Sequence, residues 1–291
     1  MMTIANASTI ETSYANLEGR TLAYRKFGKG PPLVLAVRFR GTMDSWDPLF
    51  LDELAKNFTV VIFDYTGLGA STGTPTYDRA SLAKDVGDLI DFLGFEKVVM
   101  GGWSLGGVVA QVFAVTYPDK VSQAVLIGTA PPGHPKVSAE PLFIKTAMNP
   151  VNTLDDEFVL FFEPASEGSK AAAKRSHDRI AERQMGRSPA IPEATFLKLL
   201  SEAKDRSTIY PDPEMAHMKK LSGGDVPLLV ITGDHDIACP VENWLELVRD
   251  WKSLHLVTLP QAGHGPHHQE PHYCADVIAS FVRNHQVSER P

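Results

Sequence analysis

The stretch Gly102-Trp103-Ser104-Leu105-Gly106-Gly107 decides the fold of this chain. It follows a mostly apolar run, residues 97–101, that has the length of a buried β-strand, and it opens a segment of helical periodicity that extends to Tyr117. A serine between a strand and a helix, flanked by glycines, predicts a sharp turn that lifts its hydroxyl above the edge of a sheet. Because Gly-x-Ser-x-Gly alone arises by chance in about one chain in ten of this size, the strand and the helix around it carry the prediction.

Short apolar runs alternate with helical patterns on both sides of this stretch. The runs are rich in Val, Ile and Leu, which is typical of strands covered on both faces, and they comprise residues 33–37, 59–63, 123–128, 226–232 and 254–259. The helical patterns comprise residues 47–57, 79–93, 241–251 and 271–285. The alternation predicts an α/β fold with a mostly parallel central sheet and helices on both faces. Residues 21–26 predict one peripheral antiparallel strand.

One long segment, residues 131–224, interrupts the alternation. It contains no strand-like run, and helical patterns follow one another at residues 154–162, 171–185 and 192–204. Proline, glycine and serine mark both of its ends, as expected of hinges. We therefore predict a core domain formed by residues 1–130 and 225–291, and a helical cap domain formed by residues 131–224.

Composition and charge exclude several classes of protein. Hydrophobic residues make up 43% and charged residues 22% of the chain, as in ordinary soluble globular proteins. Lys and Arg total 28 against 35 Asp and Glu, a net charge of −7 without a basic run, so nucleic acid is not an expected partner. No apolar run reaches the ~20 residues that cross a bilayer, and residues 1–19 do not resemble a signal peptide. We expect no membrane partner and a cytoplasmic location.

The two cysteines, Cys239 and Cys274, fit no metal spacing. We expect them to be buried thiols, and a disulfide between them is left open.

A serine hydroxyl is a weak nucleophile and needs a base, which in turn needs a group that orients it. Both appear after later predicted strands. Asp234 and Asp236 follow the strand at residues 226–232, and His264 follows the strand at residues 254–259. The chain order of nucleophile, acid and histidine therefore predicts nucleophilic catalysis by Ser104.

With these residues in this order, the chain resembles the α/β-hydrolase superfamily with an inserted cap. The most similar branch holds small cofactor-free esterases, lactonases, haloperoxidase-like enzymes and C–C bond hydrolases. The resemblance implies a triad of Ser104, Asp236 and His264, because relatives place the acid three residues after the glycine that ends the strand. It also implies that no cofactor is needed, that Asp64 belongs to a structural loop, and that serine at the elbow gives an acyl-serine intermediate.

The chain departs from this family at Arg38. Many relatives have a His-Gly pair there, and the residue after the pair donates a backbone N–H to the oxyanion. The resemblance then implies an oxyanion hole formed by Leu105 and Phe39. Arg38 and Arg40 have two open interpretations: they hold an anionic or enol-type substrate or the oxyanion itself, or they anchor the loop to carboxylates such as Asp44 or Asp47.

Aromatic residues and histidines near the predicted site have further alternatives. Trp103 and three phenylalanines of the cap either line a substrate pocket or belong to the core; these are Phe158, Phe161 and Phe162. Three histidines after the catalytic one, together with Glu270, could suggest zinc, but their spacing is not that of a usual zinc site. We assign no metal, and we expect these imidazoles at the surface near the mouth of the site; they are His267, His268 and His272.

These expectations combine into one main hypothesis and two alternatives. The main one is a serine hydrolase that cleaves a small or medium carboxylic ester or lactone, with that small molecule as its partner. The first alternative keeps the triad but cleaves a C–C bond of β-diketone type or performs perhydrolysis. The second is a receptor that uses a capped pocket for binding without turnover. The sequence leaves open whether the chain forms a homodimer.

Overall fold

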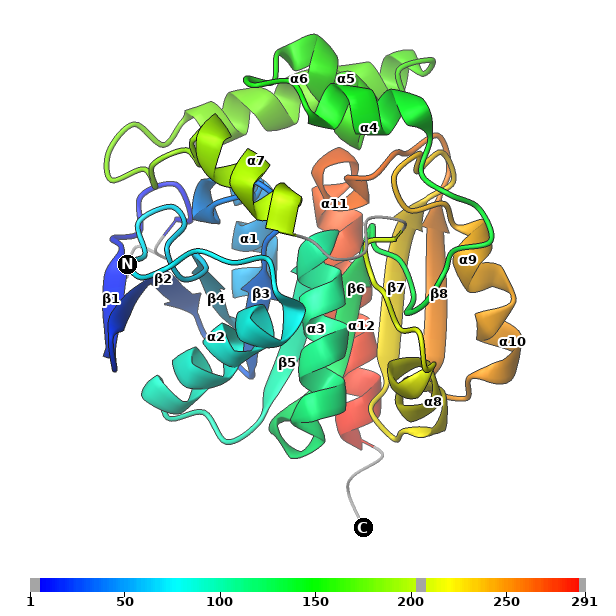
Figure 1. The fold of residues 1–291 in the computed structure, drawn as a ribbon, viewed down its shortest axis with the longest axis horizontal. Helices are drawn as coiled ribbons and strands as arrows, with labels where there is room; N and C mark the ends of the chain where they lie inside the picture. The colour runs from blue at the N-terminus through cyan, green and yellow to red at the C-terminus, as the bar shows by residue number, and fades with distance from the viewer. Residues whose placement is uncertain (1–5, 203–207, 288–291) are drawn as a thin grey trace.

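The computed structural model describes residues 6–202 and 208–287, and its centre is one eight-stranded sheet (Figure 1). The strand order is β1-β2-β4-β3-β5-β6-β7-β8. Strands β3 to β8 run parallel, and β1 and β2 add an antiparallel margin beside β4. The strands are β1 (Ser13–Leu17), β2 (Arg20–Gly28), β3 (Pro32–Ala36), β4 (Thr59–Phe63), β5 (Val98–Trp103), β6 (Val121–Ile127), β7 (Leu228–Gly233) and β8 (Leu254–Leu259).

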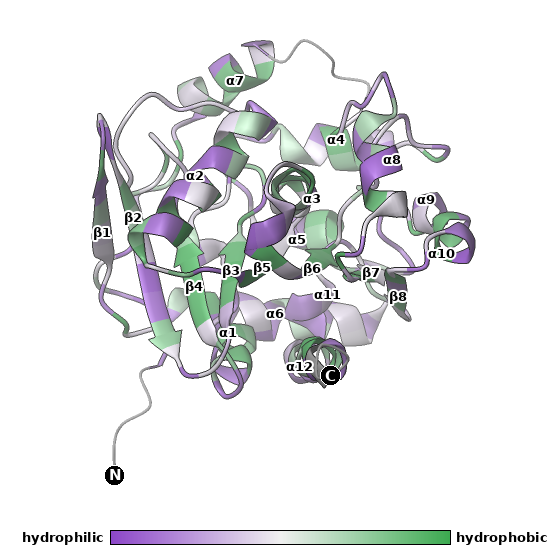
Figure 2. Cartoon of the chain, turned by 90° about the horizontal axis from the view of Figure 1, so that it is seen from below, coloured by the Kyte–Doolittle hydropathy of each residue, from purple (hydrophilic) through white to green (hydrophobic). Residues whose placement is uncertain are grey.

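Helices cover both faces of the sheet, as Figure 2 shows with the strands between two helical layers. Helices α1 (Pro48–Ala55) and α12 (Pro271–Val287) pack together on one face, and α2 (Arg79–Phe92) and α3 (Leu105–Thr116) pack together on the other. All side chains of β5 and β7 are buried, which explains why these strands are continuously apolar. The expected α/β fold with a mostly parallel sheet is confirmed.

Some elements differ from the pattern in the sequence. The helix expected at residues 241–251 is two short helices, α9 (Glu242–Leu245) and α10 (Leu247–Asp250). Three α-helices were not predicted from the sequence: α4 (Pro141–Ala147), α8 (Ala216–Gly223) and α11 (Pro266–Gln269). All three are short, and a helix of one or two turns shows too few positions to reveal a 3.6-residue period.

Four helices of the inserted segment lie over the carboxyl ends of the strands (Figure 1). They are α4, α5 (Leu154–Phe161), α6 (Glu167–Ala181) and α7 (Glu193–Glu202). Helix α8 (Ala216–Gly223) belongs to the same segment, yet it packs against α3 near the opposite end of the sheet. We call the four helices α4 to α7 the cap; the predicted domain boundaries, with a cap domain at residues 131–224, stay a prediction.

Ion pairs fasten the covering helices to the core. Arg179 on α6 binds Asp47, the residue that caps α1, and the Asp47 side chain is fully buried. Arg183 shares the buried carboxylate of Asp44 with Arg25 from β2. A buried charge that loses its partner destabilises a fold strongly, so these pairs favour one seating of α6 on the core.

Two further expectations concern membranes and cysteines. Within residues 6–202 and 208–287, no helix combines the length and the apolar character that a bilayer crossing requires. Cys239 and Cys274 are both buried free thiols, and burial raises the pKa of each.

Candidate active site

Ser104 occupies the sharp turn between β5 and α3. Its φ of 56° and ψ of −117° lie outside the regions that side-chain-bearing residues favour. The two flanking glycines make the turn sterically feasible: a Cβ on Gly102 would lie 2.0 Å from the carbonyl oxygen of Gly106, and one on Gly106 would lie 1.9 Å from that of Ala36. The turn is also held by hydrogen bonds, since the Ser104 N–H donates to Ile127 at 2.9 Å.

Asp236 and His264 meet in the structure although 28 positions separate them. The Nδ1 atom of His264 lies 3.0 Å and 2.9 Å from the two carboxylate oxygens of Asp236. The Asp236 carboxylate also accepts the backbone N–H groups of Ala238 and Cys239, which fix its orientation. Because a carboxylate accepts at Nδ1, that nitrogen carries the proton and Nε2 is left as the proton acceptor.

Asp234, the alternative acid, lies elsewhere. Its carboxylate contacts the ring of His235 at 2.6 Å and accepts the backbone N–H of Ala262. It is partly exposed, whereas the side chain of Asp236 is fully buried. Of the two candidates, the structure brings only Asp236 to His264.

The loop that carries His264 is held from two sides. From the elbow, the indole N–H of Trp103 donates to the His264 carbonyl oxygen at 2.8 Å. From the cap, the carbonyl oxygen of Phe161 accepts the N–H of Gly265 at 2.7 Å. The position of His264 is therefore coupled both to the turn that carries Ser104 and to helix α5.

Ser104 and His264 line the same cavity, whose volume is about 40 Å³. Its other lining residues come from the loop after β3 and from the cap. They are Arg38, Phe39, Arg40, Phe143, Ala147, Asn152, Leu160 and Phe161. The volume is enough for roughly two or three waters.

The two predicted oxyanion donors lie at different parts of this site. Leu105 is the first residue of α3, where the N–H groups lack intrahelical acceptors and the helix dipole favours negative charge. Phe39 lies in the loop after β3 and lines the cavity with Ser104. The centroid of the Phe39 ring lies 5.1 Å from that of the Tyr77 ring and 6.2 Å from that of the Phe196 ring.

Arg38 and Arg40 take different roles, and neither binds Asp44 or Asp47. The Arg38 guanidinium lies over the rings of Phe161 and Trp103, 4.7 Å and 5.3 Å from their centroids, beside the cavity. Arg40 instead donates to three carbonyl oxygens of the cap and stacks on Phe196 at 3.7 Å; the carbonyls belong to Ala147, Asn149 and Pro150. Arg40 therefore holds the cap, and Arg38 faces the site.

The aromatic residues predicted for the pocket separate into wall and core. Phe161 lines the cavity. Trp103 is only 1% exposed and lies beneath the cavity as part of the core. Phe162 is buried near His268, and Phe158 is half-buried against the core. Among the described residues, the cap contributes further wall positions that the sequence analysis did not single out, because they carry no distinctive chemistry: Phe143, Ala147, Asn152 and Leu160.

His267 and His268 are fully buried, which differs from the expected surface position. The ring of His267 lies within 5.3 Å of three aromatic rings, those of Trp46, Phe50 and Trp103, and neither of its nitrogens has a hydrogen-bond partner. His268 shares its Nδ1 with the hydroxyl of Ser176 on α6 at 2.9 Å. Burial lowers the pKa of His267 well below its usual value and that of His268 to about 4. The sequence pattern did not indicate this burial, because both histidines lie on one helical turn, which is too short to show a helical period.

This buried pair predicts a loss of stability in acid. The pKa is lower in the folded state, so below about pH 6.5 the unfolded chain binds protons that the folded chain does not, and stability falls toward pH 4. In this pH range, each of the two imidazoles lowers the free energy of unfolding by about 1.4 kcal/mol for every pH unit by which the pH falls. The variant His267→Phe removes one of the two titratable imidazoles and keeps an aromatic ring among those of Trp46, Phe50 and Trp103.

We expect urea unfolding at pH 6, 5.5 and 5 to show a pH slope about 1.4 kcal/mol per unit smaller in His267→Phe than in the wild type. The control is His272→Gln, because His272 is exposed and pairs with Glu53 at the surface. Equal slopes in the wild type and His267→Phe would contradict the assignment.

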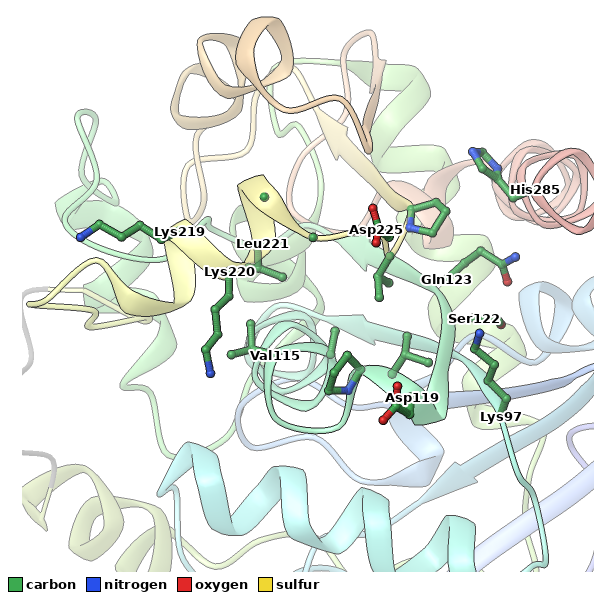
Figure 3. Close-up of a pocket in the computed structure, with 17 residues that line it drawn as sticks. Lys97, Val115, Asp119, Ser122, Gln123, Lys219, Lys220, Leu221, Asp225 and His285 are labelled. Atoms are coloured by element: carbon green, nitrogen blue, oxygen red, sulfur yellow. The ribbon is translucent and has the colours of Figure 1, made fainter. Parts of the chain in front are cut away.

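A larger hollow of about 750 Å³ lies at the opposite edge of the sheet, between the end of α3, helix α8 and the start of β7 (Figure 3). It too contains a serine and a histidine. The Ser122 hydroxyl donates to the carbonyl oxygen of Val98, however, and Nδ1 of His285 lies 2.8 Å from the carbonyl oxygen of Phe281. The Ser104 cavity is therefore the candidate active site despite its smaller volume.

The side chains of His, Cys, Asp and Glu are the ones that most often bind metal ions in proteins. Within the part of the chain that the structure describes, no three such side chains are arranged to hold a metal ion. His264 contacts Asp236, and the rings of His267 and His268 pack against the ring of Trp103.

Comparisons with known proteins agree with this architecture. Residues 31–271 match the family model described as alpha/beta hydrolase fold. The proline iminopeptidase PfmaB of Pestalotiopsis fici is 26% identical, with 94% of this chain and 98% of the relative covered. The bifunctional esterase/perhydrolase DCH of Acinetobacter calcoaceticus is 26% identical, with coverages of 83% and 87%.

A solved structure gives the same result. The alpha/beta hydrolase fold protein from Chitinophaga pinensis superposes with a TM-score of 0.83 at 27% identity, covering 96% of this chain and 99% of the other. The family model alone spans most of the chain and includes Ser104, Asp236 and His264. The chain belongs to the α/β-hydrolase fold family.

Proposed function

We propose that this protein is a serine hydrolase that cleaves a small or medium carboxylic ester or lactone through an acyl-serine. The observation that carries the proposal is the paired contact of His264 Nδ1 with both oxygens of Asp236, in a loop that shares one cavity with Ser104. This arrangement leaves Nε2 as a base in the cavity that Ser104, at the N-terminus of α3, also lines.

In the proposed reaction, Ser104 Oγ attacks the carbonyl carbon while His264 Nε2 takes its proton. Asp236 stabilises the resulting imidazolium, and the N–H groups of Leu105 and Phe39 donate to the tetrahedral oxygen. The intermediate collapses, the C–O bond to the alcohol breaks, and His264 protonates the leaving oxygen. His264 then removes a proton from water, which attacks the acyl-serine and releases the carboxylic acid.

One observation favours testing a second chemistry with the same triad. The Arg38 guanidinium lies beside the cavity, where a cation could stabilise the enolate that C–C cleavage of a β-diketone produces. A relative named as an esterase/perhydrolase adds perhydrolysis to the reactions worth measuring.

The experiment is a panel of methyl and p-nitrophenyl esters, lactones and β-diketones, with and without hydrogen peroxide. We expect ester or lactone turnover that Ser104→Ala abolishes. Diketone cleavage without ester turnover would replace the proposal with the C–C alternative, and tight ligand binding without any turnover would favour a receptor.

A further inference from the structure

Among the described residues, Arg38 is a partly buried arginine without a carboxylate partner, whereas other arginines of low exposure are paired. Arg25 binds Asp44, and Arg179 binds Asp47. Within residues 6–202 and 208–287, no Asp or Glu oxygen lies within 4.0 Å of the Arg38 guanidinium. Glu157, whose charge acts on Arg38, is bound to His177 at 3.0 Å.

The hydrogen-bond donors of Arg38 are also incompletely used. Its Nη1 donates to the carbonyl oxygen of Phe39 at 2.9 Å, which fixes the guanidinium plane. Its Nε is buried and has no acceptor. A guanidinium has five N–H donors in a fork that fits a carboxylate, and a buried donor without an acceptor is unfavourable. The stacking on Phe161 and Trp103 offsets part of the cost of burying the charge, but it supplies no acceptor.

The cavity beside Ser104 is positively charged. Its lining contains two arginines, Arg38 and Arg40, and no aspartate or glutamate. The guanidinium of Arg40 donates to carbonyl oxygens of the cap, so Arg38 is the cavity-lining arginine that keeps a donor without an acceptor. Burial lowers the pKa of Arg38 to about 10, and the side chain therefore keeps its charge at pH 7.

We propose that Arg38 is a specificity residue that binds a carboxylate on the substrate, so that the enzyme prefers anionic esters, such as half-esters of dicarboxylic acids, over neutral ones. The inference rests on the proposed serine hydrolase function and names its substrate class. A carboxylate supplies the acceptors that Arg38 lacks and neutralises its charge next to the reacting carbonyl.

The test compares pairs of methyl esters that differ only in that a methyl group replaces the terminal carboxylate. Monomethyl succinate, glutarate and adipate are matched with methyl butanoate, pentanoate and hexanoate. For the wild type we expect the best half-ester to exceed its neutral partner by roughly tenfold to hundredfold in kcat/KM, the value of a charge-assisted hydrogen bond. Equal kcat/KM for every pair would overturn the proposal without any variant being made.

Variants then assign the preference to Arg38. We expect Arg38→Met to abolish the ratio between partners, mainly through KM, and Arg38→Lys to retain part of it. The control is Lys145→Met, which removes an exposed charge from the same cap helix as Phe143 and leaves the ratio unchanged. If Arg38→Met lowers kcat for both partners equally and the ratio survives, Arg38 acts on the oxyanion and the proposal is wrong.

Calorimetry separates this inference from the proposed function. Monomethyl glutarate is titrated into Ser104→Ala, and into the same protein carrying Arg38→Met. Binding that is lost with Arg38 supports the anion subsite even if no ester is turned over, a result that would overturn the hydrolase proposal alone. Equal binding in both proteins, or binding in neither, would overturn the anion subsite.

Discussion

Ser104→Ala is expected to lower kcat for ester hydrolysis by at least about 10⁴-fold, with little change in KM. The substitution removes the one oxygen that forms the acyl bond, whereas the cavity and the oxyanion donors remain. Since these remaining groups still bind substrate and polarise its carbonyl, a residual rate above that in water is expected. Steady-state kinetics on the best ester of the panel provides the measurement.

The fold of this variant is not expected to change. Alanine at position 104 meets the same strained φ as serine, so the free energy of unfolding should stay within about 1 kcal/mol of the wild type. Ser104→Gly is the matched control: it also removes the hydroxyl, but glycine relieves the positive φ, and we expect stability to rise by about 1 kcal/mol. Retained turnover in either variant would mean that Ser104 is not the nucleophile.

Gly106→Ala is expected to be the most damaging single methyl group in the core. The added Cβ would lie 1.9 Å from the carbonyl oxygen of Ala36 and 2.4 Å from its carbon, and both atoms belong to the backbone of β3. Helix α3 and strand β3 would have to separate at the centre of the molecule. We expect a loss of at least about 4 kcal/mol in the free energy of unfolding, measured by urea denaturation, or failure to fold.

Gly168→Ala provides the control, because Gly168 lies in α6 and the nearest atom to its Cβ would be 3.7 Å away. There the methyl group should raise stability slightly or leave it unchanged, by up to about 1 kcal/mol. A Gly106→Ala protein as stable as this control would show that the close approach of α3 to β3 is not required.

The catalytic side chains were predictable because each follows a strand. A parallel sheet places the ends of β5, β7 and β8 at one edge, so residues just after those strands converge whatever their separation in sequence. Position after a strand did not identify the acid, because Asp234 and Asp236 both follow β7. Only the resemblance to a family selected Asp236. The contact with His264 agrees with that selection.

The surroundings of the site were less predictable, for physical reasons. His267 and His268 lie in the short helix α11, and histidine is intermediate in its tendency to be buried, so residue type did not predict their position. Their burial depends on α6 and on the rings of Trp46 and Trp103, which come from distant parts of the chain. The roles of Arg38 and Arg40 were likewise open, because the carboxylates near them in sequence bind other arginines in the folded chain.

Labelling with a fluorophosphonate, read by intact mass, tests directly whether Ser104 is an activated nucleophile. We expect the wild type to gain the mass of one phosphonyl group and Ser104→Ala to gain none under the same conditions. A wild type that stays unlabelled, or a Ser104→Ala variant labelled to the same extent, would show that Ser104 is not an activated nucleophile.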